Sequence, residues 1–175
     1  MMDTVLNLGL NDKTVGGLAK ETGDERFAFD CYRRFIMMFA DVVMEVDKKE
    51  FEKILEERKH EQGITTDIEL KAEDMSGLAD RFKAHYRNRL GKEFPQDPLQ
   101  QLALAREAVF SSWKNKRAVE YRRLNRISDD LGTACTVQAM VFGNLGDSSG
   151  TGVGFTRDPS TGENRFYGEF LLKAQ

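Results

Sequence analysis

The sequence predicts an α+β fold, in which a helical subdomain is followed by two further helices and a small antiparallel sheet. Up to about Asn125, apolar residues recur at three- and four-residue spacing, which is typical of amphipathic helices. After Gly132 the period changes to two, which is typical of strands. Near the end of the chain, Asp158-Pro-Ser-Thr-Gly162 combines a proline and a glycine as a tight turn does.

Four helices are expected in residues 11–96, which form the predicted helical subdomain. Their expected ranges are about 11–23, 24–45, 47–63 and 72–90. The second has the strongest apolar stripe, which includes Phe27, Cys31 and Phe35. We therefore expect this helix to form the core of the subdomain.

Residues that favour helix ends lie at these limits. Asn11 or Asp12 can cap the first helix. Asp47, with Glu50 three residues later, is similar to a capping box, and Gly63 suits a Schellman stop.

A break between two helices is expected at Phe94-Pro-Gln-Asp-Pro98, because two nearby prolines disfavour helix in the residues before them. We place a boundary here, between residues 11–96 and 97–175. Asp97 and Pro98 suit the cap and first position of a new helix. Its expected apolar anchors are Leu99, Leu102, Val109, Phe110 and Trp113. Asn115 can then cap a helix that continues through Arg126.

Three strands are expected after these helices. In residues 133–142 both alternating faces are largely apolar, which predicts a central strand. The glycine-rich segment from Gly150 and the segment from Tyr167 are the second and third strands. The turn at residues 158–162 should join these two in a hairpin.

Composition argues against two classes of partner. The 26 basic and 29 acidic residues leave a formal net charge of -3, which suits neither nucleic acid nor a polybasic membrane surface. No apolar run approaches the ~20 residues that span a bilayer, so we expect a soluble, cytoplasmic protein.

Cys31 and Cys135 lack a metal-binding spacing with His60 and His85. We expect reduced cysteines and no metal site.

Two patterns could contact a ligand. Gly150, Gly152 and Gly154 fall on one face of a strand, where another backbone or a flat ligand can approach closely. Arg33 and Arg34 could grip phosphate or form the solvated stripe of their helix. The residues alone leave both alternatives open.

Several longer sequence motifs resemble those of one family. They are Met1-Met-Asp-Thr-Val-Leu-Asn-Leu-Gly-Leu-Asn-Asp12, Tyr32-Arg-Arg-Phe35, Tyr121-Arg-Arg-Leu-Asn125, Val137-Gln-Ala-Met-Val-Phe-Gly-Asn144 and Ser149-Gly-Thr-Gly-Val-Gly-Phe-Thr-Arg-Asp-Pro-Ser-Thr-Gly-Glu163. In this order they resemble the N-terminal nucleotide-binding domain of pyruvate phosphate dikinases. The resemblance implies a partial ATP-grasp-like sheet with a helical insert. It also implies ATP binding and transfer of the β-phosphoryl group to a histidine on a separate swivelling domain, which carries it to pyruvate.

The resemblance also implies particular site residues. Residues 1–10 resemble the tail of the family's phosphate loop, with Asp3 and Thr4 as candidate nucleotide contacts. Gln138, Met140 and Val141 resemble the edge that holds adenine, beside the glycine face of Gly150 and Gly152. Arg117, Ser160 and Glu169 resemble positions where the phosphohistidine domain docks.

No catalytic residue and no metal ligand is assigned within the chain. The family's phosphate-gripping lysine and arginine correspond to positions before Met1, and its acidic Mg²⁺ ligands to positions after Gln175. We therefore expect the chain alone to be inactive. The intact enzyme is expected to use Mg²⁺ and ATP, to be a homo-oligomer, and to lie in the cytoplasm or, in a eukaryote, in an organelle.

Two alternatives remain open from the sequence. One is a fragment of a related dikinase, such as phosphoenolpyruvate synthase or a glucan, water dikinase, which phosphate dependence would distinguish. The other is a noncatalytic nucleotide-binding or regulatory module, which the flanking sequence would distinguish.

Overall fold

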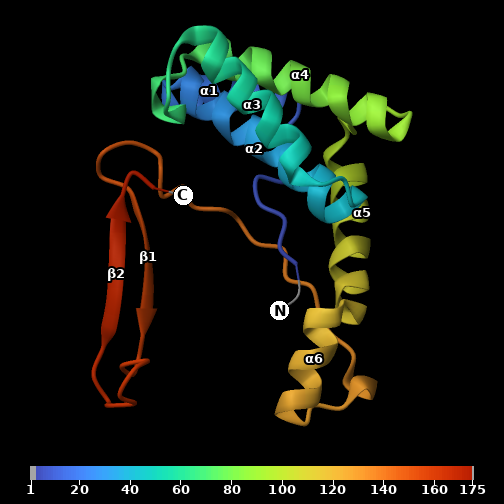
Figure 1. Ribbon diagram of the computed structural model, residues 1–175, viewed down its shortest axis with the longest axis vertical. Coiled ribbons are helices and arrows are strands. Elements are labelled where there is room, and N and C mark those ends of the chain that lie inside the picture. Colours follow the sequence, from blue (N-terminus) through green and yellow to red (C-terminus); the bar gives the residue numbers. More distant parts are fainter. Residues whose placement is uncertain (1–2, 175) are drawn as a thin grey trace. The chain divides into compact units, whose positions relative to one another are not determined.

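The computed structural model describes residues 3–174 and divides into two compact units, Met1–Gln138 and Ala139–Gln175. In the described residues, the first unit is helical and the second contains a two-stranded antiparallel sheet (Figure 1). The predicted α+β class is therefore confirmed. The predicted boundary between residues 96 and 97 lies inside the first unit and stays a prediction.

The helices lie close to their predicted ranges. The α-helices are α1 (Thr14–Thr22), α2 (Glu25–Met44), α3 (Lys48–Gln62), α4 (Ala72–Leu90), α5 (Pro98–Ser111) and α6 (Lys116–Asn125). Single 3₁₀ turns are η1 (Asp67–Glu69), η2 (Ser112–Lys114) and η3 (Asp129–Leu131).

Local capping explains where several helices begin and end. Asp24 accepts a hydrogen bond from the Phe27 backbone N–H at 2.8 Å, which fixes the start of α2. At the end of α3, Gly63 adopts a left-handed conformation, and the next N–H, of Ile64, donates to the Lys59 carbonyl at 3.1 Å. This is the predicted Schellman stop.

Glu50 does not complete the capping box predicted for α3. Its carboxylate lies 2.8 Å from His85 Nε2 and 2.9 Å from Arg89 Nε, both on α4. The side chain therefore joins α3 to α4 instead of capping its own helix. His85 is consequently part of a contact between helices.

An aromatic cluster forms the core of the first unit, where α2 packs against α1, α3, α4 and α5. Phe94, in the segment between α4 and α5, is 2% exposed. Its ring makes edge contacts with Tyr32, Phe35 and Phe39 of α2 and Tyr86 of α4, at centroid distances of 5.4 to 6.3 Å. The proline-containing segment thus contributes its first residue to the core.

Arg33 belongs to a buried ion pair, so the solvated-stripe interpretation is wrong for it. Arg33 is 2% exposed, and its guanidinium pairs with the carboxylate of Asp30, which lies one turn earlier in α2. The same carboxylate also pairs with Arg34. Burial of Asp30 opposes ionisation, but the two arginines hold the pKa of its carboxyl below the usual range. Both arginines therefore have a structural partner within α2.

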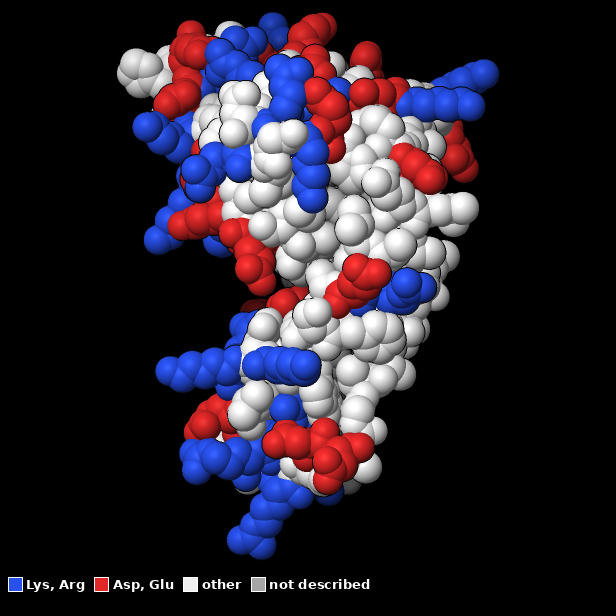
Figure 2. Space-filling view, turned by 90° about the vertical axis from the view of Figure 1, so that its right-hand side faces the viewer, with Lys and Arg blue, Asp and Glu red and all other residues white. Residues whose placement is uncertain are grey.

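The predicted anchors of α5 are partly wrong. Leu99 is 74% exposed and Phe110 is 42% exposed, whereas Gln101 and Ala105 are buried. Successive helical residues are rotated by about 100°, so Leu99 and Phe110 lie roughly opposite Gln101. In Figure 2, uncharged side chains dominate the middle of the face in view, where Figure 1 places α5.

The central strand predicted for residues 133–142 is wrong. This segment has no regular secondary structure, and Val137 and Val141 are 66% and 92% exposed. An alternating pattern fixes which faces of a strand are apolar, but the strand itself needs a hydrogen-bonded neighbour. In the described residues, β1 and β2 pair only with each other.

The second and third predicted strands form the expected hairpin. The strand β1 (Gly150–Phe155) pairs antiparallel with β2 (Tyr167–Leu172), with Gly152 opposite Phe170. In the connecting turn, Asp158 Oδ1 accepts the backbone N–H groups of Ser160 and Thr161. Gly162 takes a positive φ of 78°, as the turn sequence predicted.

Replacing Phe94 with alanine should destabilise the first unit by about 3–5 kcal/mol, because it leaves a cavity among four rings. The matched control is Leu99→Ala, at an exposed apolar residue, which should change stability by no more than about 0.5 kcal/mol. Urea unfolding followed by far-ultraviolet circular dichroism measures both. Equal losses for the two variants would contradict this description of the core.

Candidate functional site

Asp3, a predicted nucleotide contact, lies against the junction of α5 and α6. Its backbone N–H donates to Ser112 Oγ at 3.2 Å. Its carboxylate accepts from Asn115 Nδ2 at 3.3 Å and lies 3.6 Å from Arg117 Nη2. The next predicted contact, Thr4, is exposed, while Met1 and Met2 of the same loop prediction lie outside the described residues.

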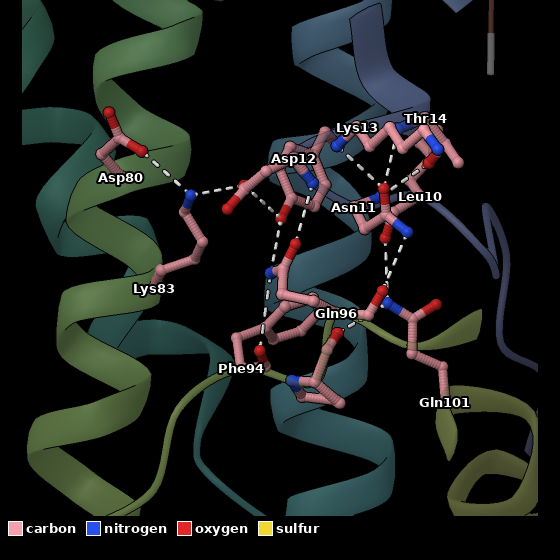
Figure 3. A network of polar contacts seen from close by, with 12 residues as sticks. Leu10, Asn11, Asp12, Lys13, Thr14, Asp80, Lys83, Phe94, Gln96 and Gln101 are labelled. Atoms are coloured by element: carbon pink, nitrogen blue, oxygen red, sulfur yellow. Dashed lines mark hydrogen bonds and ion pairs between the residues drawn. The ribbon is translucent and has the colours of Figure 1, made fainter. Parts of the chain in front are cut away.

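The chain that follows is fixed by the side chain of Gln101, which is completely buried. Its Nε2 donates to the carbonyls of Leu10 and Pro95 at 3.0 and 2.8 Å, and its Oε1 accepts the Gly9 N–H at 3.0 Å. Figure 3 shows Gln101 directed toward the chain at Leu10 and Asn11. One amide thus joins α5 to the N-terminal segment and to the turn before α5.

Gln96 makes a second attachment through Asp12. Its Oε1 accepts the Asp12 N–H at 2.9 Å (Figure 3). Its Nε2 donates to the Tyr32 hydroxyl at 3.2 Å. The same hydroxyl donates to Asp12 Oδ1, which also pairs with Lys83 Nζ at 2.6 Å. Burial raises the pKa of the Tyr32 phenol, so it stays a hydrogen-bond donor.

A cavity of about 260 Å³ lies beside Asp3. It is lined by the last turn of α2 and one side of α5, and its lining includes three carboxylates, those of Asp3, Glu45 and Glu107. Three nearby negative charges repel phosphate oxygens. The cavity itself is therefore unsuited to the triphosphate of a nucleotide.

The residues predicted to hold adenine lie at the division between the two units. Gln138 is exposed and ends the first unit, whereas Met140 is half-buried and Val141 exposed in the second. The adenine role of all three stays a prediction.

The glycine face of β1 is closely approached by its own hairpin. A Cβ at Gly152 would lie 2.9 Å from the Glu169 carbonyl oxygen, and one at Gly154 would lie 3.0 Å from the Phe166 ring. A Cβ at Gly150 would lie 3.1 Å from the Leu171 carbonyl oxygen. These distances favour the close-packing interpretation of the glycines. Nucleotide contact by Gly150 and Gly152 stays a prediction.

The three predicted docking residues are all exposed. Arg117 lies in the first turn of α6 in the first unit, while Ser160 and Glu169 lie in the turn and in β2 of the second. Backbone N–H groups of Ser160 and Thr161 lower the pKa of the Asp158 carboxyl, which keeps it ionised and holds the turn around Ser160. The docking role of these residues stays a prediction.

Residues 3–174 do not gather a metal-binding set. No group of three or more His, Cys, Asp or Glu side chains among them is arranged to hold a metal ion.

Sequence reasoning missed the residues that hold the N-terminal segment. Gln101, Ser112 and Asn115 contact residues that are 92 to 112 positions away in the sequence. The spacing of Gln101 and Ser112 was an available signal. They lie four residues before and seven residues after Ala105, so a helix places all three side chains on one face, and this face is buried.

Comparison with known proteins identifies the family. The family model described as pyruvate phosphate dikinase, AMP/ATP-binding domain, matches residues 1–174. The chain belongs to this family. This is the same family that the sequence motifs resemble.

Several relatives match the whole chain. Pyruvate, phosphate dikinase of Clostridium symbiosum is 59% identical over 176 residues, and that of Rhizobium meliloti is 57% identical over 175 residues. Pyruvate, phosphate dikinase 1, chloroplastic, of Arabidopsis thaliana is 55% identical over 175 residues. The matches cover 100% of this chain and 18 to 20% of the relatives, so the chain spans about a fifth of their length.

In residues 3–174, none of the helices combines the length and apolar character that crossing a membrane requires.

Replacing Gln101 with leucine should destabilise the first unit by about 2–4 kcal/mol, because it leaves the half-buried N–H of Gly9 and the buried carbonyls of Leu10 and Pro95 without their partner. Gln100→Leu makes the same chemical change at the neighbouring exposed position and should have an effect within about 0.5 kcal/mol. Denaturant unfolding gives the free energies, and amide hydrogen exchange at Gly9 reports the local effect. Unchanged exchange at Gly9 in the Gln101 variant would contradict the proposed attachment.

Proposed function

We propose that this chain supplies part of the ATP-binding domain of a pyruvate, phosphate dikinase. The intact enzyme would convert ATP, phosphate and pyruvate to AMP, pyrophosphate and phosphoenolpyruvate. The observation that carries this proposal is the family match over residues 1–174, together with 59% identity to the Clostridium symbiosum enzyme along the whole chain.

Nucleotide contact is assigned to two sets of residues. Asp3 and Thr4 lie at the end of the predicted phosphate loop, where backbone N–H groups receive phosphate oxygens. The Asp3 N–H already donates to Ser112 Oγ, so of these two backbone groups that of Thr4 would receive the phosphate. Gln138, Met140 and Val141 would form the adenine edge, with Gly150 and Gly152 on an adjoining strand face of an ATP-grasp-like sheet. The attachment of residues 9–12 by Gln96 and Gln101 supports the first assignment, because it anchors the chain that leaves the loop.

We propose that the helices of residues 11–96 form an insert beside a nucleotide-binding subdomain, with the boundary between residues 96 and 97.

Arg117, Ser160 and Glu169 are proposed to contact the swivelling domain that carries the phosphohistidine. All three are exposed, and two carry opposite charges. Charged contacts of this kind speed transient docking and make it sensitive to salt.

The remaining features concern the intact enzyme. We propose that its Mg²⁺ ligands, like its phosphate-gripping lysine and arginine, lie outside these 175 residues, and that it is a homo-oligomer. A cytoplasmic location is proposed, with an organelle as the eukaryotic alternative, since some plant relatives are named chloroplastic.

A chimera tests the function. This chain would replace the segment of the Clostridium symbiosum enzyme that it matches. The chimera should form phosphoenolpyruvate from pyruvate only when both ATP and phosphate are present, whereas the chain alone should form none. A coupled assay for phosphoenolpyruvate measures both.

Each contrary result has a distinct meaning. Activity without phosphate would favour the phosphoenolpyruvate synthase alternative. A folded chimera without activity would favour the noncatalytic module. Phosphoenolpyruvate formation by the 175 residues alone would contradict the assignment of the catalytic groups to the rest of the enzyme.

A further inference from the structure

Asp3 provides the negative charge at the beginning of α6. The first turn of this helix contains no acidic residue, and its N-cap, Asn115, makes no capping hydrogen bond with its own side chain. The Asn115 amide donates instead to Asp3 Oδ2 at 3.3 Å. A carboxylate is stabilised near the positive N-terminal end of a helix dipole. Asp3 thus takes the place of an acidic residue in the helix itself.

Arg117 is held by the same carboxylate. Its Nη2 lies 3.6 Å from Asp3 Oδ1, and its side chain is 68% exposed, whereas that of Asp3 is 25% exposed. The carboxylate that α6 itself contains, that of Glu120, pairs with Arg123. Asp3 therefore sets the local charge around Arg117.

The backbone of Asp3 is anchored independently of its carboxylate. Its N–H donates to Ser112 Oγ, and this hydroxyl donates to the Val109 carbonyl at 2.7 Å. Ser112 is 2% exposed. The position of Asp3 is thus fixed from the end of α5, while its carboxylate is directed to the start of α6.

We propose that Asp3 is a positioning residue for Arg117, which links the nucleotide-binding end of the chain to the docking face. The inference rests on the proposed function, which assigns nucleotide contact to Asp3 and docking to Arg117. An anionic phosphate that approaches residues 3 and 4 lies beside the carboxylate that holds the arginine. Nucleotide binding and docking therefore influence each other through one ion pair, and the influence is reciprocal.

The first test uses the isolated chain and the NMR signal of the Arg117 side-chain Nε–Hε group. Asp3→Asn removes the charge but keeps an oxygen for Asn115, and it should shift this signal. Glu120→Gln removes a charge from the same helix but not from the partner of Arg117, so it should leave the signal in place. An unchanged Arg117 signal in the Asp3 variant would overturn the proposal.

The second test uses the chimera and measures phosphohistidine formation from ATP. At saturating ATP, Asp3→Asn should slow this step by about two- to fivefold, the range expected of a partly exposed ion pair. In an Arg117→Gln background the same substitution should have no further effect. Exchange between phosphoenolpyruvate and pyruvate, which does not use this domain, should be unchanged in every variant.

The outcomes separate the two proposals. If Asp3→Asn slows phosphohistidine formation by the same factor with and without Arg117, Asp3 acts independently and the link is wrong. If the unsubstituted chimera forms no phosphohistidine but retains the exchange reaction, the proposed function is wrong and the link to docking falls with it. The NMR comparison then still decides whether Asp3 holds Arg117.

Discussion

The buried amide of Gln101 constrains both the N-terminal segment and the helix that carries it. A side-chain amide without partners in a protein interior costs about 1–3 kcal/mol, and here the backbone groups of Gly9, Leu10 and Pro95 meet that need. Since these three groups are fixed in the chain, α5 must turn Gln101 toward them. The opposite face of α5, with Leu99 and Phe110, is then directed outward. The exposure of two apolar residues follows from satisfying one polar residue.

This constraint also explains which parts of the fold the sequence predicts well. The ends of α2 and α3 depend on Asp24 and Gly63, whose hydrogen bonds reach no more than five residues along the chain. Such contacts can be inferred from a short window. The face of α5 depends on Gly9, which is 92 residues away, and apolar periodicity alone selects the wrong residues there. Local chemistry therefore predicts where the helices are, and long-range polar contacts decide how they are turned.

The strands show the same distinction. The hairpin of β1 and β2 is predictable because its turn, Asp158 to Gly162, contains the groups that close it. Residues 133–142 have an equally clear alternation but no such local partner, so their apolar pattern does not produce a strand in the described residues. Alternation indicates the capacity to pair, and pairing requires a second segment. The candidate adenine edge lies in this segment, so its geometry could not be predicted from its own residues.

The candidate site depends on contacts of both kinds. Thr4 and Ser160 can be placed near a loop or turn from their immediate neighbours, whereas the contact between Asp3 and Arg117 joins residues 114 positions apart. Neither residue alone indicates the other, because a single aspartate and a helix-terminal arginine are ordinary surface residues. What makes the pair specific is the absence of an acidic residue in the first turn of α6. A helix start that lacks its own carboxylate favours one from elsewhere, and Asp3 supplies it because Ser112 fixes its backbone close by.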